Sequence, residues 1–188
     1  TYIIRRIVKN FTIIKFVWGN YQSLRNFIIF FVNKKILKRQ FIPDIYNNIN
    51  IETSSKCNLK CKFCAYPQRD LTSHPHTTMK TEKFEQILKN VKQLGYKNIG
   101  LTPSTGDIFL DKKIFEKISL IENYDFNGFY FYTNFIPINE KKIERLFSYK
   151  KLTHLGISIY GHDEASFINF SKGTSNSFKI LKKNLEFF

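Results

Sequence analysis

The sequence predicts an α/β fold in which a parallel sheet is built from strands that alternate with amphipathic helices. Two observations carry this prediction. From residue 48 onward, short stretches of alternating apolar residues are followed, four times over, by longer stretches with helical apolar spacing, which is the pattern of βαβ units. The helical stretches also have residues typical of helix ends, such as Asn139 at a start and Gly95 at a stop.

The strands are expected at 48–53, 97–102, 128–133 and 152–160. The helices are expected at 81–94, after Asp111, after Asn139, and from Ser175 or Ser177 onward. Right-handed crossovers between parallel strands place every strand's carboxyl end at one rim of the sheet, where ligands bind in such folds. The segments expected to meet at that rim are the loop after the first strand, Ser104–Asp107, Thr133–Asn134 and Ser158–His162.

Residues 1–44 are predicted to form a basic, amphipathic helical segment ahead of a core domain at 45–188. Apolar residues recur at helical spacing from Ile4 to Trp18, and Gly19 is expected to end this first helix. A second apolar run from Leu24 to Phe31 leads into a cluster of lysines and an arginine. Such helices pack against their own domain, lie on an anionic membrane surface, or bind a partner helix.

The composition is that of one globular domain of 188 residues, 43% hydrophobic, with a net charge of +15. The basic residues are spread along the chain without a dense block or a nucleic-acid-binding motif, so nucleic acid is not expected as a partner. No apolar run reaches the roughly 18 residues of a membrane span. Clustered cysteines are typical of a reducing compartment, and we expect a cytoplasmic location, with the inner membrane face as an alternative.

All three cysteines lie within eight residues, as Cys57, Cys61 and Cys64. Thiolates are soft ligands that bind iron–sulfur clusters, zinc or copper. Three thiolates leave one position open, whereas structural zinc sites are usually closed by a fourth protein ligand. An open iron can hold a substrate or cofactor. Two other interpretations stay open: buried apolar cysteines, and a zinc site completed by His74 or His76.

The cluster motif of the radical S-adenosylmethionine (SAM) superfamily is similar to the stretch Cys57-Asn58-Leu59-Lys60-Cys61-Lys62-Phe63-Cys64, including the aromatic residue before the third cysteine. The resemblance implies a [4Fe–4S] cluster on the three cysteines, with SAM chelated by the open iron. It implies reductive cleavage of SAM to a 5′-deoxyadenosyl radical that abstracts hydrogen from a peptide or small metabolite. The implied partner is a low-potential electron donor, flavodoxin- or ferredoxin-like.

The resemblance extends to the loops after the second and third strands. Thr105-Gly106-Asp107 stands where the family has Gly-Gly-Glu-Pro, whose backbone carbonyls accept the SAM amino group. Only Gly106 matches outright, and Asp107 keeps the acidic character. Thr133-Asn134-Phe135 stands where many members have Thr-Asn-Gly, so Asn134 is expected to carry the left-handed turn itself.

Two further segments resemble SAM-binding elements of the family. Ile157-Ser158-Ile159-Tyr160-Gly161 is similar to Ile-Ser-x-Asp-Gly, which implies that Ser158 reaches the SAM ribose or carboxylate while Tyr160 replaces the usual acid. Lys172-Gly173 stands where relatives have an Arg-Gly that contacts the SAM carboxylate. Lysine keeps the charge there but loses the bidentate fork of arginine.

The family fold that the resemblance implies is a partial TIM-like barrel of six βα units. Residues 48–188 supply about four of these units, so we expect an incomplete barrel, truncated before its last strands, that follows an N-terminal helical segment. The alternatives to a radical SAM enzyme are an inactive fragment, a non-catalytic iron–sulfur or zinc module, and a membrane-surface protein in which the cluster serves structure.

Overall fold

The computed structural model describes residues 17–21, 23–38 and 48–188, and the chain divides into two compact units, 1–46 and 47–188. The second unit contains a parallel sheet with its strands in the order β1-β2-β3-β4. These strands are β1 (Asn48–Asn50), β2 (Asn98–Gly100), β3 (Gly128–Thr133) and β4 (Leu152–Ile157). The predicted α/β fold is confirmed, as an open parallel sheet that forms part of a barrel.

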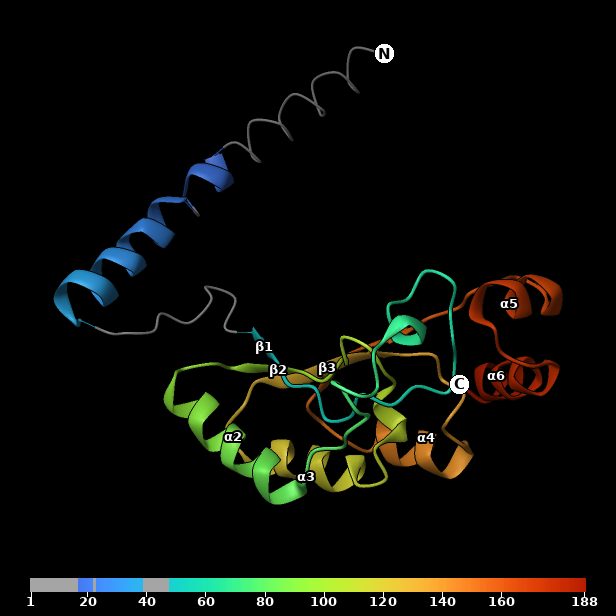
Figure 1. Cartoon of the computed structure of the whole chain (residues 1–188). Coiled ribbons are helices and arrows are strands. Elements are labelled where there is room, and N and C mark those ends of the chain that lie inside the picture. The colour runs from blue at the N-terminus through green and yellow to red at the C-terminus, as the bar shows by residue number, and fades with distance from the viewer. Residues whose placement is uncertain (1–16, 22, 39–47) are drawn as a thin grey trace, which may run out of the picture. The chain divides into compact units, whose positions relative to one another are not determined.

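The sheet is covered by helices that alternate with its strands, as predicted. These are α2 (Thr81–Gln93), α3 (Ile114–Asn123) and α4 (Glu140–Phe147), which lie together on one side of the sheet in Figure 1. Asn139 caps α4 by accepting a hydrogen bond from the N–H of Lys142, and Gly95 follows α2 with a φ of 90°. Asp111 accepts from the N–H of Lys113, one residue before α3 begins.

The chain after β4 forms two helices, α5 (Glu164–Ser171) and α6 (Ser175–Phe187). Helix α6 was predicted, and Thr174 caps it. Helix α5 was not predicted. It begins with a capping box, in which the Asp163 carboxylate accepts from the N–H of Ser166 and the Ser166 hydroxyl accepts from the N–H of Asp163. This missed helix turns out to support the cysteine loop.

Strand β3 separates an apolar layer from a polar one. Phe129 and Phe131 are buried, and the Phe131 ring meets that of Phe109 edge-on at 5.6 Å. Because side chains alternate along a strand, Tyr132 lies on the opposite face. There it lies over Gly156 of β4, where a Cβ would come within 2.1 Å of the tyrosine ring. The glycine therefore makes room for an aromatic side chain above the carboxyl end of the sheet.

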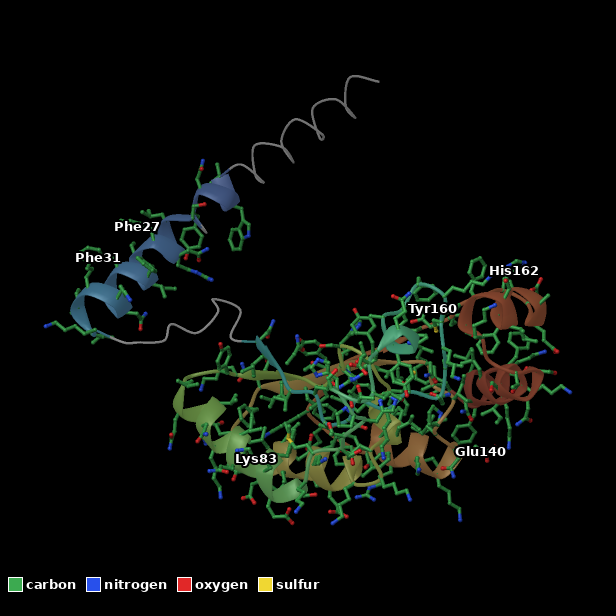
Figure 2. The ribbon with its side chains drawn as sticks, in the orientation of Figure 1. Phe27, Phe31, Lys83, Glu140, Tyr160 and His162 are labelled. Atoms are coloured by element: carbon green, nitrogen blue, oxygen red, sulfur yellow. The ribbon has the colours of Figure 1, made fainter. Side chains whose placement is uncertain are left out.

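The first unit is helical at residues 17–21 and 23–31 and continues as the π-helical turn η1 (Val32–Ile36). Gly19 lies inside a helical stretch, so the prediction that it ends a helix is wrong; nothing within 4 Å would meet a Cβ there. The predicted helix before residue 17 lies outside the described residues. Phe27 and Phe31 project from the same side of the helix in Figure 2, with stacked rings 6.3 Å apart. No helix in the described ranges is both long and apolar enough to cross a membrane.

A buried ion pair ties α3 to the loop before it. Lys117 and Asp111 are 0% and 1% exposed, and the ammonium group donates to the carboxylate and to the carbonyl oxygen of Met79. Removing one member of a buried pair leaves the other charge in the interior without a partner. The loss of folding free energy is then larger than the cost of burying the intact pair.

We expect Lys117→Met, which keeps the side-chain length, to lower the free energy of unfolding by about 3–5 kcal/mol. Urea denaturation measures this change. Lys89→Ala is the matched control, because its ion pair with Glu85 is largely exposed and is expected to matter little. Equal losses in the two variants would contradict this account of the buried pair.

Candidate metal and cofactor site

A cavity of about 340 Å³ lies at the carboxyl ends of the four strands. The loop after each strand contributes to its lining, so the predicted meeting of four segments at one rim is confirmed. The lining residues are Cys57, Leu59, Cys61, Phe63, Cys64 and Ala65 after β1; Thr102, Pro103, Ser104, Gly106 and Asp107 after β2; Tyr132, Thr133 and Asn134 of β3 and its loop; and Ser158 and Tyr160 after β4.

The cysteine loop is held in place by backbone hydrogen bonds to two other parts of the fold. The N–H groups of Lys60 and Lys62 donate to the carbonyl oxygens of Ser171 (3.1 Å) and Phe170 (2.9 Å), at the end of α5. The carbonyl oxygen of Lys56 accepts from the N–H of Asp107 at 2.7 Å. The loop is thus held just before Cys57 and on both sides of Cys61, which restricts where the thiols can lie.

The three thiols influence one another electrostatically. Burial raises the pKa of Cys57 to about 11, and the nearby charges of Asp107, Cys61 and Cys64 act in the same direction. Burial and Cys64 likewise raise the pKa of Cys61. Without a bound cation, Cys57 is therefore held as a neutral thiol at neutral pH. A metal bound here must displace its proton.

Three thiols are a donor set that an iron–sulfur cluster can use. Among the described residues, no group of three or more His, Cys, Asp or Glu is arranged to hold one metal ion. A zinc ion would bring its sulfur ligands to about 3.8 Å from one another, since tetrahedral Zn–S bonds are about 2.3 Å long. A cluster binds each cysteine through a different iron, so its ligands lie further apart. Neither His74 nor His76 lines the cavity.

Tyr66, which follows the cysteines, contacts two of them. Its N–H donates to the Sγ of Cys64 at 3.3 Å, and its hydroxyl donates to the carbonyl oxygen of Cys57 at 3.1 Å. Its ring stacks on that of His76, with centroids 4.9 Å apart. This role was not predicted, because a tyrosine after the motif carries no pattern of its own.

Gly106 allows the loop after β2 to lie against the segment that leads into the cysteines. A Cβ at this position would be 2.8 Å from the carbonyl oxygen of Ser54 and 2.9 Å from that of Lys56. Only glycine fits between these backbones without displacing them. The neighbouring Thr105 does not line the cavity; its hydroxyl accepts a hydrogen bond from Nη1 of Arg69 at 3.1 Å.

Asp107 is 1% exposed, and both of its carboxylate oxygens accept hydrogen bonds. One accepts from the N–H of Phe109 at 3.0 Å, and the other from the Thr133 hydroxyl and the Asn134 N–H, each at 2.8 Å. Burial raises the pKa of this carboxyl group, against the opposing effect of these donors. Although Asp107 lines the cavity, its carboxylate joins protein segments to one another.

Asn134 is paired with Asn58 of the cysteine motif. Its Nδ2 donates to the Asn58 Oδ1 at 2.8 Å, and its own Oδ1 accepts from the N–H of Ile136 at 3.1 Å. The left-handed residue of this turn is Phe135, with a φ of 59°, so the prediction that Asn134 adopts that conformation is wrong. The fully buried Phe135 ring and the bond from Asn184 to its carbonyl oxygen hold the strained backbone in place.

The loop after β4 places Ser158 and Tyr160 at the cavity. The N–H of Ser158 donates to the carbonyl oxygen of Thr133 at 2.8 Å; its hydroxyl has no hydrogen-bond partner within the described part of the chain. The ring of Tyr160 packs on that of Phe63, with centroids 4.8 Å apart. His162 is exposed near α5 (Figure 2) and does not line the cavity, in contrast to the expectation that it lies on the rim.

Lys172 lies at the end of α5 in a left-handed conformation, with a φ of 55°. Its side chain is exposed, and it does not line the cavity. It follows directly after Ser171, whose carbonyl oxygen accepts from the cysteine loop.

The family profile of the radical SAM superfamily matches residues 51–187, which include every segment that lines the cavity. The chain belongs to the radical SAM superfamily. Its members are enzymes that use a [4Fe–4S] cluster and SAM, and they generally need a reductant and a substrate. The predictions of the family and of its two cofactors are therefore confirmed.

A curated relative and two solved structures are similar to this radical SAM chain. The chain is 28% identical over 86 residues to a probable GTP 3′,8-cyclase of Archaeoglobus fulgidus, across 42% of this chain and 28% of that protein. SuiB of Streptococcus suis bound to SAM matches with a TM-score of 0.60 and 20% identity, over 89% of this chain and 35% of that one. The structure of anSMEcpe with bound SAM matches with a TM-score of 0.58 and 21% identity, over 75% of this chain and 39% of that one. At these identities the two structures show the fold alone, and the chain spans well under half of each protein.

We expect Asp107→Asn to lower the free energy of unfolding by about 1–3 kcal/mol, although the two side chains have the same shape. An amide has one NH₂ group, which must face either the N–H of Phe109 or the donors of Thr133 and Asn134. One buried donor is then left without an acceptor. Urea denaturation tests this.

The control is Asp163→Asn, because asparagine caps a helix as well as aspartate does. No measurable change is expected in that variant. An Asp107→Asn protein as stable as the control would show that the carboxylate does not join these loops.

Proposed function

We propose that this chain is a radical SAM enzyme in which Cys57, Cys61 and Cys64 hold a [4Fe–4S] cluster. The observation that supports this most is the cavity itself, in which the three thiols share one lining with the loops after all four strands. When bound, the reduced cluster supplies the electron that cleaves SAM, and the 5′-deoxyadenosyl radical released abstracts hydrogen from the substrate.

The chain's own contribution at the cluster is electrostatic. The N–H of Tyr66, directed at the Cys64 sulfur, is of the kind that tunes cluster reduction potentials. Lys56, Lys60 and Lys62 are exposed around the cysteines and add positive charge, which favours thiolates and the more negative reduced state. The same positive charges suit the binding of an acidic, low-potential electron donor of the flavodoxin or ferredoxin type. Clustered thiols and such a donor belong to a reducing compartment, so the proposed location is the cytoplasm.

We assign SAM to the side of the cavity formed after β2 and β4. Ser158 is the best-placed residue, because it lines the cavity and its hydroxyl makes no hydrogen bond within the described part of the chain, which leaves it free to bind a ribose or carboxylate oxygen. The backbone at Gly106 borders the same space, whereas Asp107 and Asn134 act as positioning residues whose polar groups bind other parts of the protein. Contacts from Thr105 and Lys172 to SAM stay predictions, since neither side chain lines the cavity.

The substrate class we propose is a peptide or a small metabolite. Tyr132 and Tyr160 line the cavity, and Phe63 packs on Tyr160. Aromatic faces of this kind bind planar or apolar groups, and the cavity volume is within the range of small-molecule sites. The cyclase relative, named for a reaction of a nucleotide, agrees with a small-molecule substrate.

Replacing any one of Cys57, Cys61 and Cys64 by Ala is expected to abolish the four-iron absorption of anaerobically reconstituted protein, together with reductive cleavage of SAM. Two thiolates hold a cluster too weakly to survive gel filtration. Lys83→Ala, an exposed change on α2 outside the cavity lining, is the control and is expected to keep its iron. A triple Ala variant with an unchanged iron content would disprove the assignment.

Ser158→Ala is expected to weaken SAM binding about two- to tenfold while the cluster is retained, which corresponds to the loss of one hydrogen bond. Anaerobic calorimetry measures the affinity. Ser148→Ala is the control, because that hydroxyl donates only to the carbonyl oxygen of Arg145 at the end of α4. An unchanged affinity in Ser158→Ala would remove this residue from the SAM site.

A further inference from the structure

The helical stretches 17–21 and 23–31 of the first unit expose a series of large apolar side chains. Val17, Tyr21, Leu24, Ile28 and Phe31 recur every three or four residues, which places them on one side of a helix. Trp18 and Phe27 lie at the margins of this stripe, and the rings of Trp18 and Tyr21 are 5.6 Å apart. These seven side chains, which we call the apolar face, are between 47% and 64% exposed.

The same segment is positively charged throughout. Residues 1–43 contain no Asp or Glu. Their basic residues are Arg5, Arg6, Lys9, Lys15, Arg25, Lys34, Lys35, Lys38 and Arg39. Among the described ones, Lys34, Lys35 and Lys38 are exposed and follow directly after the apolar face. The charge of this segment is thus of one sign, and its natural counterpart is a strongly anionic surface.

We propose that residues 17–38 bind the surface of an anionic lipid bilayer, with the apolar face in the boundary between head groups and acyl chains and the lysines among the phosphates. The combination of a broad apolar face, aromatic residues and lysines without acids is that of interfacial helices. Trp and Tyr prefer this boundary because their rings are amphipathic. The segment lies on the membrane and does not span it.

The positive charge of the segment favours anionic membranes over neutral ones. Anionic lipids give the cytoplasmic leaflet a negative potential, which attracts each nearby Lys or Arg. A neutral bilayer offers the apolar face the same boundary without this attraction. Binding is therefore expected to depend on both acidic lipid and ionic strength, since the Debye length falls from about 10 Å at 0.1 M salt to 3 Å at 1 M.

Trp18 makes the test direct, because it is the one tryptophan of the chain and belongs to the apolar face. The full chain is mixed with phosphatidylcholine vesicles, either pure or with a third of phosphatidylglycerol. We expect a blue shift of tryptophan emission and co-flotation with the acidic vesicles, both reduced by 0.5 M salt. Equal binding to neutral vesicles, or no blue shift with acidic ones, would overturn the proposal.

Charge reversal separates this segment from the general basic charge of the protein. Lys34→Glu with Lys35→Glu is expected to weaken vesicle binding at least about 30-fold, since each lysine contributes about fivefold. Lys141→Glu with Lys142→Glu, an adjacent exposed pair on α4, is the matched control and is expected to change binding little. Equal weakening in both variants would overturn the assignment to residues 17–38.

Two further measurements exclude other occupants of the apolar face. Phe27→Ser with Phe31→Ser is expected to abolish the blue shift while circular dichroism shows the core domain still folded. Self-association in light scattering, with no flotation, would overturn the proposal in favour of a partner helix. None of these readouts requires a cluster or SAM cleavage, so they stand or fall independently of the proposed enzymatic function.

Discussion

Asp107 joins the segments on which the candidate site depends. Its carboxylate accepts from the 3₁₀ turn that it caps and from the end of β3, while its own N–H donates to the carbonyl oxygen of Lys56, just before the first cysteine. The end of β3 and the residue before the first cysteine, which are far apart in the sequence, are thereby both fixed to Asp107. The carboxylate is tolerated in the interior because both of its oxygens accept hydrogen bonds. The neighbouring Gly106 is the steric counterpart of this interaction, since any larger residue would separate the same backbones.

The helices with a strong apolar face and a capping residue were predictable from sequence because their signals are local. Phe84, Leu88 and Val91 of α2 are all buried, and Asn139 caps α4 as expected. Helix α5 gave no such signal: of its residues only Phe167 and Ser171 are buried, and its apolar side chains do not follow one face. The carbonyl oxygens of Phe170 and Ser171 accept hydrogen bonds from the cysteine loop. This is a tertiary contact, and no sequence pattern indicates it.

The candidate site was predictable only in part, for a similar reason. Cysteine spacing is a local property, and the order of strands and helices brings the loops to one rim. The pairing of Asn58 with Asn134 joins residues 76 positions apart, and nothing in either neighbourhood indicates it. At the turn that contains Phe135, a local signal was present but indicated the wrong residue. Local propensity assigns the left-handed conformation to asparagine, but the burial of the phenylalanine ring decides otherwise.

The charges around the three cysteines link the binding of a cluster to the protonation of the thiols. Burial, and after it the nearby charges of Asp107 and the other two cysteines, disfavours the Cys57 thiolate and raises the pKa of Cys57 to about 11. A bound cluster reverses this balance, because its iron ions attract the same thiolates that otherwise repel one another. Burial and these neighbouring charges together make formation of the Cys57 thiolate, and with it cluster binding, dependent on pH. The backbone hydrogen bonds from Lys60 and Lys62 do not change with the charge of the sulfurs, so they are available to hold the loop in either state.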